Sequence, residues 1–305
     1  MLNTFLSILP IFLLIVAGYL ARHYFLTDEG FWKTADKAVY YLFFPSLLVL
    51  EISHANFDGG ATTHALVATV GGTLIVAAVI LIGQCVVNVK NDLFTSIFQG
   101  GVRYNSYVFI ALSQSLFGTE GVALSGVFVA YMIVLTNVMS VLLMNHYGTG
   151  GKKSVAGSVL ALAKNPLIIA ALLGVVLNLV GVSINGAIRQ FLAYLGNAAT
   201  PLSLMSVGGG LVLSMHVSRT IATAYATALK LLLLPICTFV LLKALGVSGV
   251  SANIALLYAA VPCAGNAYIL ARQMGGDTEA MASIITWTTL FSVVTVTVIL
   301  GTFLL

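Results

Sequence analysis

The chain has 305 residues, of which 60% are hydrophobic and only 7% are charged. A soluble domain carries about 25% charged residues, so this chain cannot cover a water-facing surface and is expected in a lipid bilayer. Thirteen basic residues against nine acidic ones give a net charge of +4, too small and too scattered for a nucleic-acid-binding face. The three cysteines lie far apart in apolar stretches, which excludes a disulfide framework and argues against a metal cluster.

Ten apolar stretches are long enough to cross a bilayer, because a helix needs about 20 mostly apolar residues to do so. The first stretch follows no basic residue and contains no small-residue cleavage site, so it is interpreted as a retained span. The sequence predicts an all-α, multi-pass membrane protein without a soluble domain. The expected spans are 3–22, 34–54, 64–87, 94–116, 121–146, 158–180, 187–214, 221–244, 252–273 and 280–303.

Lysine and arginine are distributed unevenly between the loops. Only Arg189 and Lys243 lie in or beside the even-numbered loops. Basic residues favour the cytoplasmic side, so the odd-numbered loops are expected in the cytoplasm and both termini outside it. The basic residues of the odd-numbered loops and their flanks are Arg22, Lys33, Lys37, Lys90, Lys152, Lys153, Arg219 and Arg272.

The two halves of the chain share a pattern. Two prolines and a glycine of spans 1 and 2 recur 156 residues later in spans 6 and 7: Pro10, Gly18 and Pro45 against Pro166, Gly174 and Pro201. Five spans per half would place residues 1–150 and 151–305 in opposite orientations, as inverted repeats. Inverted repeats are typical of secondary transporters. The alternative is that prolines are simply frequent in membrane helices.

Spans 4 and 9 are expected to be broken. Span 9 contains Pro262 and Gly265, which weaken a helix, followed by Asn266. At the corresponding place span 4 has two glycines and Asn105, but no proline. Freed backbone groups at membrane depth are tolerated only where they line a cavity or find partners. The two breaks are therefore the candidate binding site.

Arg103 lies near the middle of span 4, where a charged side chain costs several kcal/mol. The sequence offers it no acidic residue at similar depth. A buried guanidinium suits a carboxylate, which it can bind through two hydrogen bonds. The alternatives are neutralisation by backbone carbonyls or extension of the side chain toward the surface.

Further polar residues lie inside the spans, each with two interpretations. Lys230 of span 8 either faces the same cavity or extends toward the cytoplasmic surface. Asn137, Thr288, Thr289 and Ser292 either line an ion or water path or make interhelical hydrogen bonds, which are common in membranes. For the hydroxyl residues of span 10 the packing interpretation is favoured.

The order and spacing of several motifs extend over the whole chain, and they resemble the auxin efflux carrier family, which includes bacterial malate and malonate permeases. The resemblance implies a scaffold of spans 1, 2, 6 and 7, a moving transport domain of spans 3–5 and 8–10, and broken spans 4 and 9 that cross at the substrate. Bile-acid symporters share this general architecture. The motifs are Leu9-Pro10, Gly18-Tyr19, Phe44-Pro45, Gln99 to Asn105, Asn165-Pro166, Pro201-Leu202, Val261 to Asn266 and the threonine-rich last span.

The resemblance also implies a homodimer. It favours a bacterial inner membrane, since the long cytoplasmic loop of the plant members is absent. Family members often have a proline at both breaks. Span 4 of this chain has Arg103 and Asn105 there instead, so the geometry of the crossing stays open.

The sequence thus favours a secondary transporter or uniporter of small organic anions such as malate, malonate or auxin-like weak acids, working by elevator-type alternating access. The alternative is a sodium-coupled symporter of larger organic anions. No cofactor is expected, and sodium or proton coupling stays open. An enzyme is disfavoured because no buried carboxylate or histidine cluster is present. The expected substrate-binding residues are Arg103, Asn105, Ser106, Tyr107, Pro262, Cys263, Gly265 and Asn266.

Overall fold

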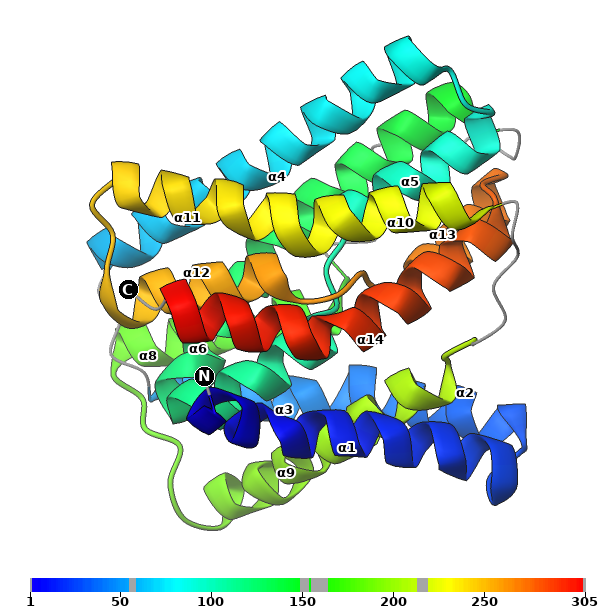
Figure 1. Cartoon of the computed structure of the whole chain (residues 1–305). Coiled ribbons are helices and arrows are strands. Elements are labelled where there is room, and N and C mark those ends of the chain that lie inside the picture. The colour runs from blue at the N-terminus through cyan, green and yellow to red at the C-terminus, as the bar shows by residue number, and fades with distance from the viewer. Residues whose placement is uncertain (1, 55–58, 149–153, 155–163, 213–218, 304–305) are drawn as a thin grey trace.

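The computed structural model describes residues 2–54, 59–148, 154, 164–212 and 219–303, and this part is helical without a strand (Figure 1). The first half contains α1 (Leu2–Tyr24), α2 (Glu29–Ala38), the π-helical turn η1 (Val39–Phe43), α3 (Phe44–Ser53), α4 (Gly59–Val87), α5 (Asn91–Val102) and α6 (Ser106–Tyr147). The second half contains α8 (Pro166–Val180), α9 (Gly186–Gly209), α10 (Thr220–Ala228), the π-helical turn η3 (Leu229–Leu233), α11 (Leu234–Ala244), α12 (Gly249–Ala260), α13 (Ala267–Met274) and α14 (Thr278–Phe303).

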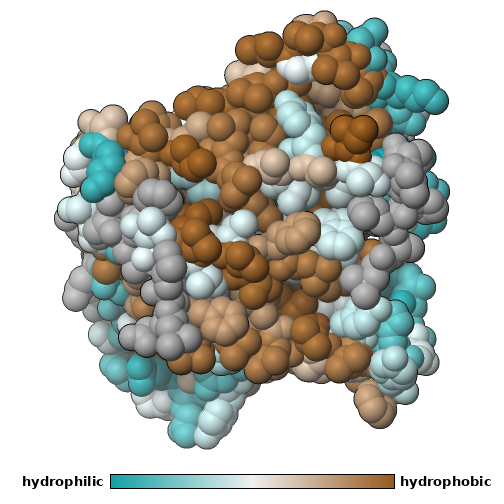
Figure 2. Space-filling view, viewed as in Figure 1, coloured by the Kyte–Doolittle hydropathy of each residue, from teal (hydrophilic) through white to brown (hydrophobic). Residues whose placement is uncertain are grey.

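The chain is a membrane protein by the length and composition of its helices. Within the described residues, four helical segments are long and apolar enough to cross a bilayer: Gly60–Val87, Asn91–Tyr147, Thr220–Ala244 and Thr278–Thr302. Figure 2 shows apolar side chains over the middle of one face and hydrophilic residues toward its left and right margins. Because the helices run between these margins (Figure 1), the apolar band covers their middle portions on this face.

The described helices pack in two groups. In the lower part of Figure 1, α1 packs on α9, and α3 packs on both α8 and α9. In the upper part, α4 packs on α11 and α12, while α5 packs on α10 and α14. Helix α6 contacts helices of both groups, including α3, α8 and α12. With the exception of α6, these helices therefore make their main contacts within their own group.

Glycine allows α1 and α9 to pack backbone against backbone. A Cβ atom added to Gly208 would lie 1.8 Å from the carbonyl oxygen of Ile15, and one added to Gly18 would lie 1.9 Å from that of Met205. Such distances are impossible for real atoms, so no larger residue fits without moving a helix. Small residues commonly permit this kind of close approach in membranes.

Each π-helical turn ends two residues before a proline. Pro45 follows η1 and Pro235 follows η3, each as the second residue of the next helix. A proline ring clashes with the carbonyl four residues earlier and donates no hydrogen bond, and a π turn accommodates both effects by widening the helix. The turn η3 matters for the site because it carries Lys230.

Replacement of Gly208 by alanine is expected to destabilise the protein, because the new methyl group must push α1 and α9 apart. Overpacking of this kind typically costs about 1–3 kcal/mol. Thermal unfolding of the purified protein in detergent measures the effect. Gly210→Ala is the matched control, since its Cβ would lie 3.5 Å from the nearest atom. Equal melting temperatures for the two variants would contradict this account of the packing.

Candidate functional site

Two helices are interrupted at the places that the sequence predicts. Helix α5 ends at Val102 and α6 begins at Ser106, with Arg103 in an extended conformation between them. Helix α12 ends at Ala260 and α13 begins at Ala267. The two interruptions meet, because the Asn105 amide donates a hydrogen bond to the carbonyl oxygen of Pro262 at 2.9 Å.

Side chains satisfy part of the backbone that the interruptions leave open. The Asn105 side-chain oxygen accepts from the amides of Tyr107 and Val108, at 3.1 and 3.2 Å, and so caps α6. The Cys263 amide donates to the hydroxyl of Thr288 at 3.2 Å. These bonds replace the missing helical ones, as an apolar surrounding requires. Asn105 therefore has a structural role at the break, and Thr288 joins α14 to it.

The Arg103 guanidinium lies at the meeting point and is surrounded by amide side chains. The residue is only 4% exposed. Its Nη2 donates to the side-chain oxygens of Asn137 and Asn266, at 2.8 and 3.1 Å, and its Nη1 donates to that of Gln99 at 3.3 Å. In the described part of the chain, none of the ion pairs involves Arg103. Neutral oxygens, rather than a carboxylate or backbone carbonyls, thus accept from this charge.

The second break leads from Arg103 to the surface. Gly265 and Asn266 are both exposed, although Asn266 also contacts the buried guanidinium. A Cβ atom added to Gly265 would have nothing within 4 Å, so the space beside it is open. Helix α13 begins directly after Asn266 without a side-chain cap, which leaves its positive dipole end on this side. A small anion at this opening would therefore meet favourable electrostatics.

Lys230 is a second buried cation next to the break. The residue is 0% exposed, and its Nζ has no hydrogen-bond partner among the described residues. The Nζ lies 3.4 Å from the ring centroid of Tyr104, which stacks on Tyr258 with a centroid distance of 4.2 Å. The side chain does not extend to the cytoplasmic surface, so that interpretation of the sequence was wrong.

The other predicted residues take different positions. Ser106 and Tyr107 are partly buried at the start of α6, where the Tyr107 ring stacks on Phe44 of α3 at 5.1 Å. Pro262 and Cys263 are buried within the break. The hydroxyls of Thr289 and Ser292 are buried and donate to carbonyls of their own helix, as the packing interpretation predicts.

Three residues of the site were not identified from the sequence. Gln99 lies one helical turn before Arg103, so its position on the same helical face was a usable signal. Tyr104 and Tyr258 come together only through the packing of α12 against the first break. No local pattern predicts such a pair.

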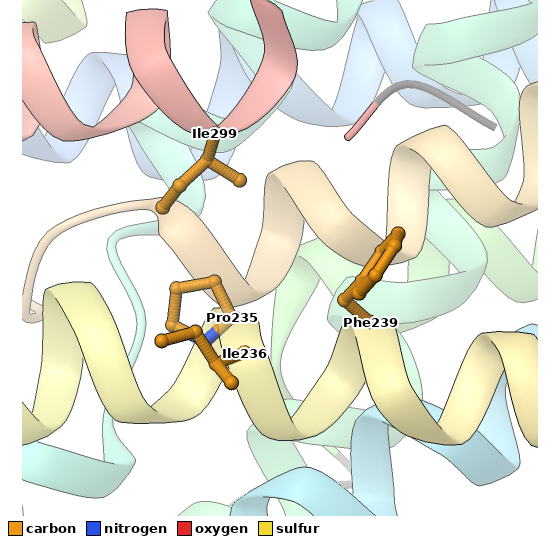
Figure 3. Close-up of a pocket in the computed structure, with 4 residues that line it drawn as sticks. All are labelled: Pro235, Ile236, Phe239 and Ile299. Atoms are coloured by element: carbon orange, nitrogen blue, oxygen red, sulfur yellow. The ribbon is translucent and has the colours of Figure 1, made fainter. Parts of the chain in front are cut away.

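The described surface also has an apolar hollow of about 320 Å³ beside α11 and α14. Figure 3 shows Pro235, Ile236 and Phe239 of α11 facing Ile299 of α14 across it. Its lining offers no hydrogen-bond donor to an anion. Among the described residues, no group of three or more His, Cys, Asp or Glu side chains could hold a metal ion.

Comparison with known proteins identifies the family. The sequence profile of the family described as "Membrane transport protein" matches residues 4–300. The chain belongs to this auxin efflux carrier family.

Members of the family from archaea and bacteria are similar over almost their full lengths. An uncharacterized transporter of Methanocaldococcus jannaschii is 25% identical over 303 residues, which cover 95% of both chains. A Rhizobium meliloti protein with the provisional name of malonate transporter is 25% identical over 297 residues, which cover 95% of this chain and 92% of that one. The chain is therefore a membrane transporter of this family.

Replacement of Asn105 by alanine is expected to loosen the first break, because α6 loses its cap. Loss of such a cap typically costs about 1 kcal/mol. Thermal unfolding in detergent measures the loss. Asn105→Ser keeps an oxygen that can accept from the same amides and is expected to recover most of the stability. If serine and alanine destabilise equally, the cap is not what Asn105 contributes.

Proposed function

We propose that the chain is a secondary transporter or uniporter of small organic anions, which bind where the two interrupted helices meet. The observation that carries the proposal is the Arg103 guanidinium. It is buried, it lies at the contact between the breaks, and among the described residues its hydrogen-bond acceptors are neutral side-chain oxygens. An intramembrane charge of this kind usually marks a substrate or ion pathway.

A carboxylate can take the place of the amide oxygens around Arg103. A carboxylate adds an opposite charge to the hydrogen bonds of the guanidinium, and the two groups match in planar geometry with two parallel hydrogen bonds. Asn266 is exposed, so it can move aside to admit the anion and then orient it through its own amide group. The uncapped start of α13 adds a positive dipole end to the same place.

We also propose that the chain crosses the bilayer ten times, with residues 1–150 and 151–305 as inverted five-helix repeats. Two interrupted helices, one in each half, support this arrangement. The start of α1 and the end of α14 lie on the same side of the molecule (Figure 1). An even number of crossings requires this, so it further supports the arrangement.

In this arrangement spans 1, 2, 6 and 7 form a fixed scaffold, and spans 3–5 and 8–10 carry the substrate past it as an elevator. The packing of α1 on α9 and of α3 on α8 and α9 supports the scaffold, and the packing of α4 on α11 and α12 supports the transport domain, whereas α6 contacts both groups. The exposed apolar faces of α8 and α9 are available for a homodimer through the scaffold. The distribution of basic residues favours termini outside the cytoplasm of a bacterial inner membrane.

The substrate is expected to be small, such as malonate or malate, and the provisional name of the Rhizobium meliloti relative supports this size. A sodium-coupled symporter of larger organic anions is the alternative. Uptake into proteoliposomes with and without sodium and a pH gradient separates the two: sodium-dependent uptake of large anions alone would overturn the proposal.

The Arg103→Ala variant is expected to lose anion binding, because the carboxylate loses its charged partner. A hydrogen bond to a charged group contributes about 1.5–3 kcal/mol, which corresponds to roughly tenfold to a hundredfold weaker binding. Thermal-shift titration with malonate, malate, succinate and indole-3-acetate measures the affinities.

Arg189→Ala is the matched control, because it removes an arginine that is exposed. It is expected to bind each carboxylate with wild-type affinity. Unchanged affinity in a folded Arg103→Ala variant would remove Arg103 from the site, and wild-type protein that binds none of the panel would overturn the proposed function.

Asn266→Ala is expected to reduce uptake into liposomes more than Thr295→Ala does. The first variant removes a partner of Arg103 at the opening, whereas the Thr295 hydroxyl donates to a carbonyl of its own helix. Initial uptake rates of the best substrate, normalised to the amount of reconstituted protein, give the comparison. Equal losses in both variants would contradict the placement of the substrate at the break.

A further inference from the structure

Lys230 is a buried charge that nothing described above uses. It has no hydrogen-bond partner among the described residues, and its residue is 0% exposed. Burial of an ammonium group is costly unless it is compensated. The Tyr104 ring face at 3.4 Å compensates only part of this cost. A negative charge nearby would compensate more of it and hold the lysine in its charged form.

The position of Lys230 connects it to the site of Arg103. Its contact residue Tyr104 directly follows Arg103 in the first break. Tyr258, on which the Tyr104 ring stacks, belongs to α12, which leads into the second break. Two cations thus lie beside the crossing, Arg103 at the contact between the breaks and Lys230 against the Tyr104 ring. In the described structure neither of them forms an ion pair with an acidic side chain.

We propose that the Lys230 ammonium acts through its field as a second positive charge of the substrate site and makes the carrier select dianions over monoanions. This inference rests on the proposed function and adds the charge of the substrate to it. Lys230 is enclosed, so it does not touch the anion. Its field is nevertheless weakly screened, because the surroundings are apolar and closed to salt.

The geometry explains how a charge can be kept at this depth without a partner. The π-helical turn η3 places Lys230 inward, and the Tyr104 ring, held between the ammonium and Tyr258, covers it. An aromatic face attracts an ammonium but not a neutral amine, so the contact favours the charged form. In this proposal the lysine is a fixed charge rather than a flexible ligand, and it functions as a positioning residue.

The test compares ligands of equal size that differ by one charge: malonate with malonamate, and succinate with succinamate, at pH 8. Wild-type protein is expected to bind each dicarboxylate more tightly than its monoamide. In Lys230→Met the field of the ammonium is absent for both ligands. The ratio of the dicarboxylate affinity to the monoamide affinity is therefore expected to fall about tenfold. A change of this order is what one unit charge produces in a low dielectric. Lys230→Gln is a second variant for the same comparison, and thermal unfolding checks the fold of both.

Lys243→Met is the matched control, because Lys243 is an exposed cation of α11, the helix that continues from η3. Its field is screened by salt, so the affinity ratio is expected to stay at the wild-type value. An equal loss for both ligands in the Lys230 variants would show a packing role only and overturn the inference. So would wild-type protein that binds monoamides as tightly as dicarboxylates. Failure to bind any of the four ligands would instead overturn the proposed function.

Discussion

The architecture around the site depends on one charge, the Arg103 guanidinium, held inside an apolar protein by neutral oxygens. If the helix continued through Arg103, the guanidinium would lie among the side chains of its own helix. The extended segment brings it to Asn137 of α6 and to Asn266 of the other break. The interruption of two helices, the Asn105 cap and the bond to Pro262 all hold that arrangement together. The guanidinium is thus held by hydrogen bonds to neutral groups, which an anion could replace under the proposed function.

The two groups of helices are held together by different kinds of contact. Glycines let α1 and α9 pack backbone against backbone, which favours a stiff unit. The breaks, by contrast, are attached to α14 through Thr288 and to α3 through the stacked rings of Tyr107 and Phe44. The first of these contacts lies within the upper group of helices and the second lies between the groups (Figure 1). If the transport domain moves as proposed, it must break the contacts between the groups, but not those within the upper group.

Much of this fold was predictable from hydropathy and from proline and glycine positions. The described helices begin and end near most of the expected span boundaries, but α6 continues through the expected joint between spans 4 and 5 with one non-helical residue, Gly118. The breaks lie at Arg103 to Asn105 and at Val261 to Asn266 because proline, glycine and capping residues act locally. The site was only partly predictable. Arg103 stands out as a deep charge, but its partners Gln99 and Asn137 depend on rotamer and packing, and the Tyr104 face under Lys230 depends on tertiary contacts.

An experimental structure of the protein in lipid with malonate bound tests the central claim most directly. The account predicts a carboxylate within hydrogen-bonding distance of the Arg103 guanidinium, beside Asn266, with at least one of the amide oxygens displaced. The account would be contradicted if malonate bound elsewhere and the oxygens of Gln99, Asn137 and Asn266 still accepted hydrogen bonds from the guanidinium.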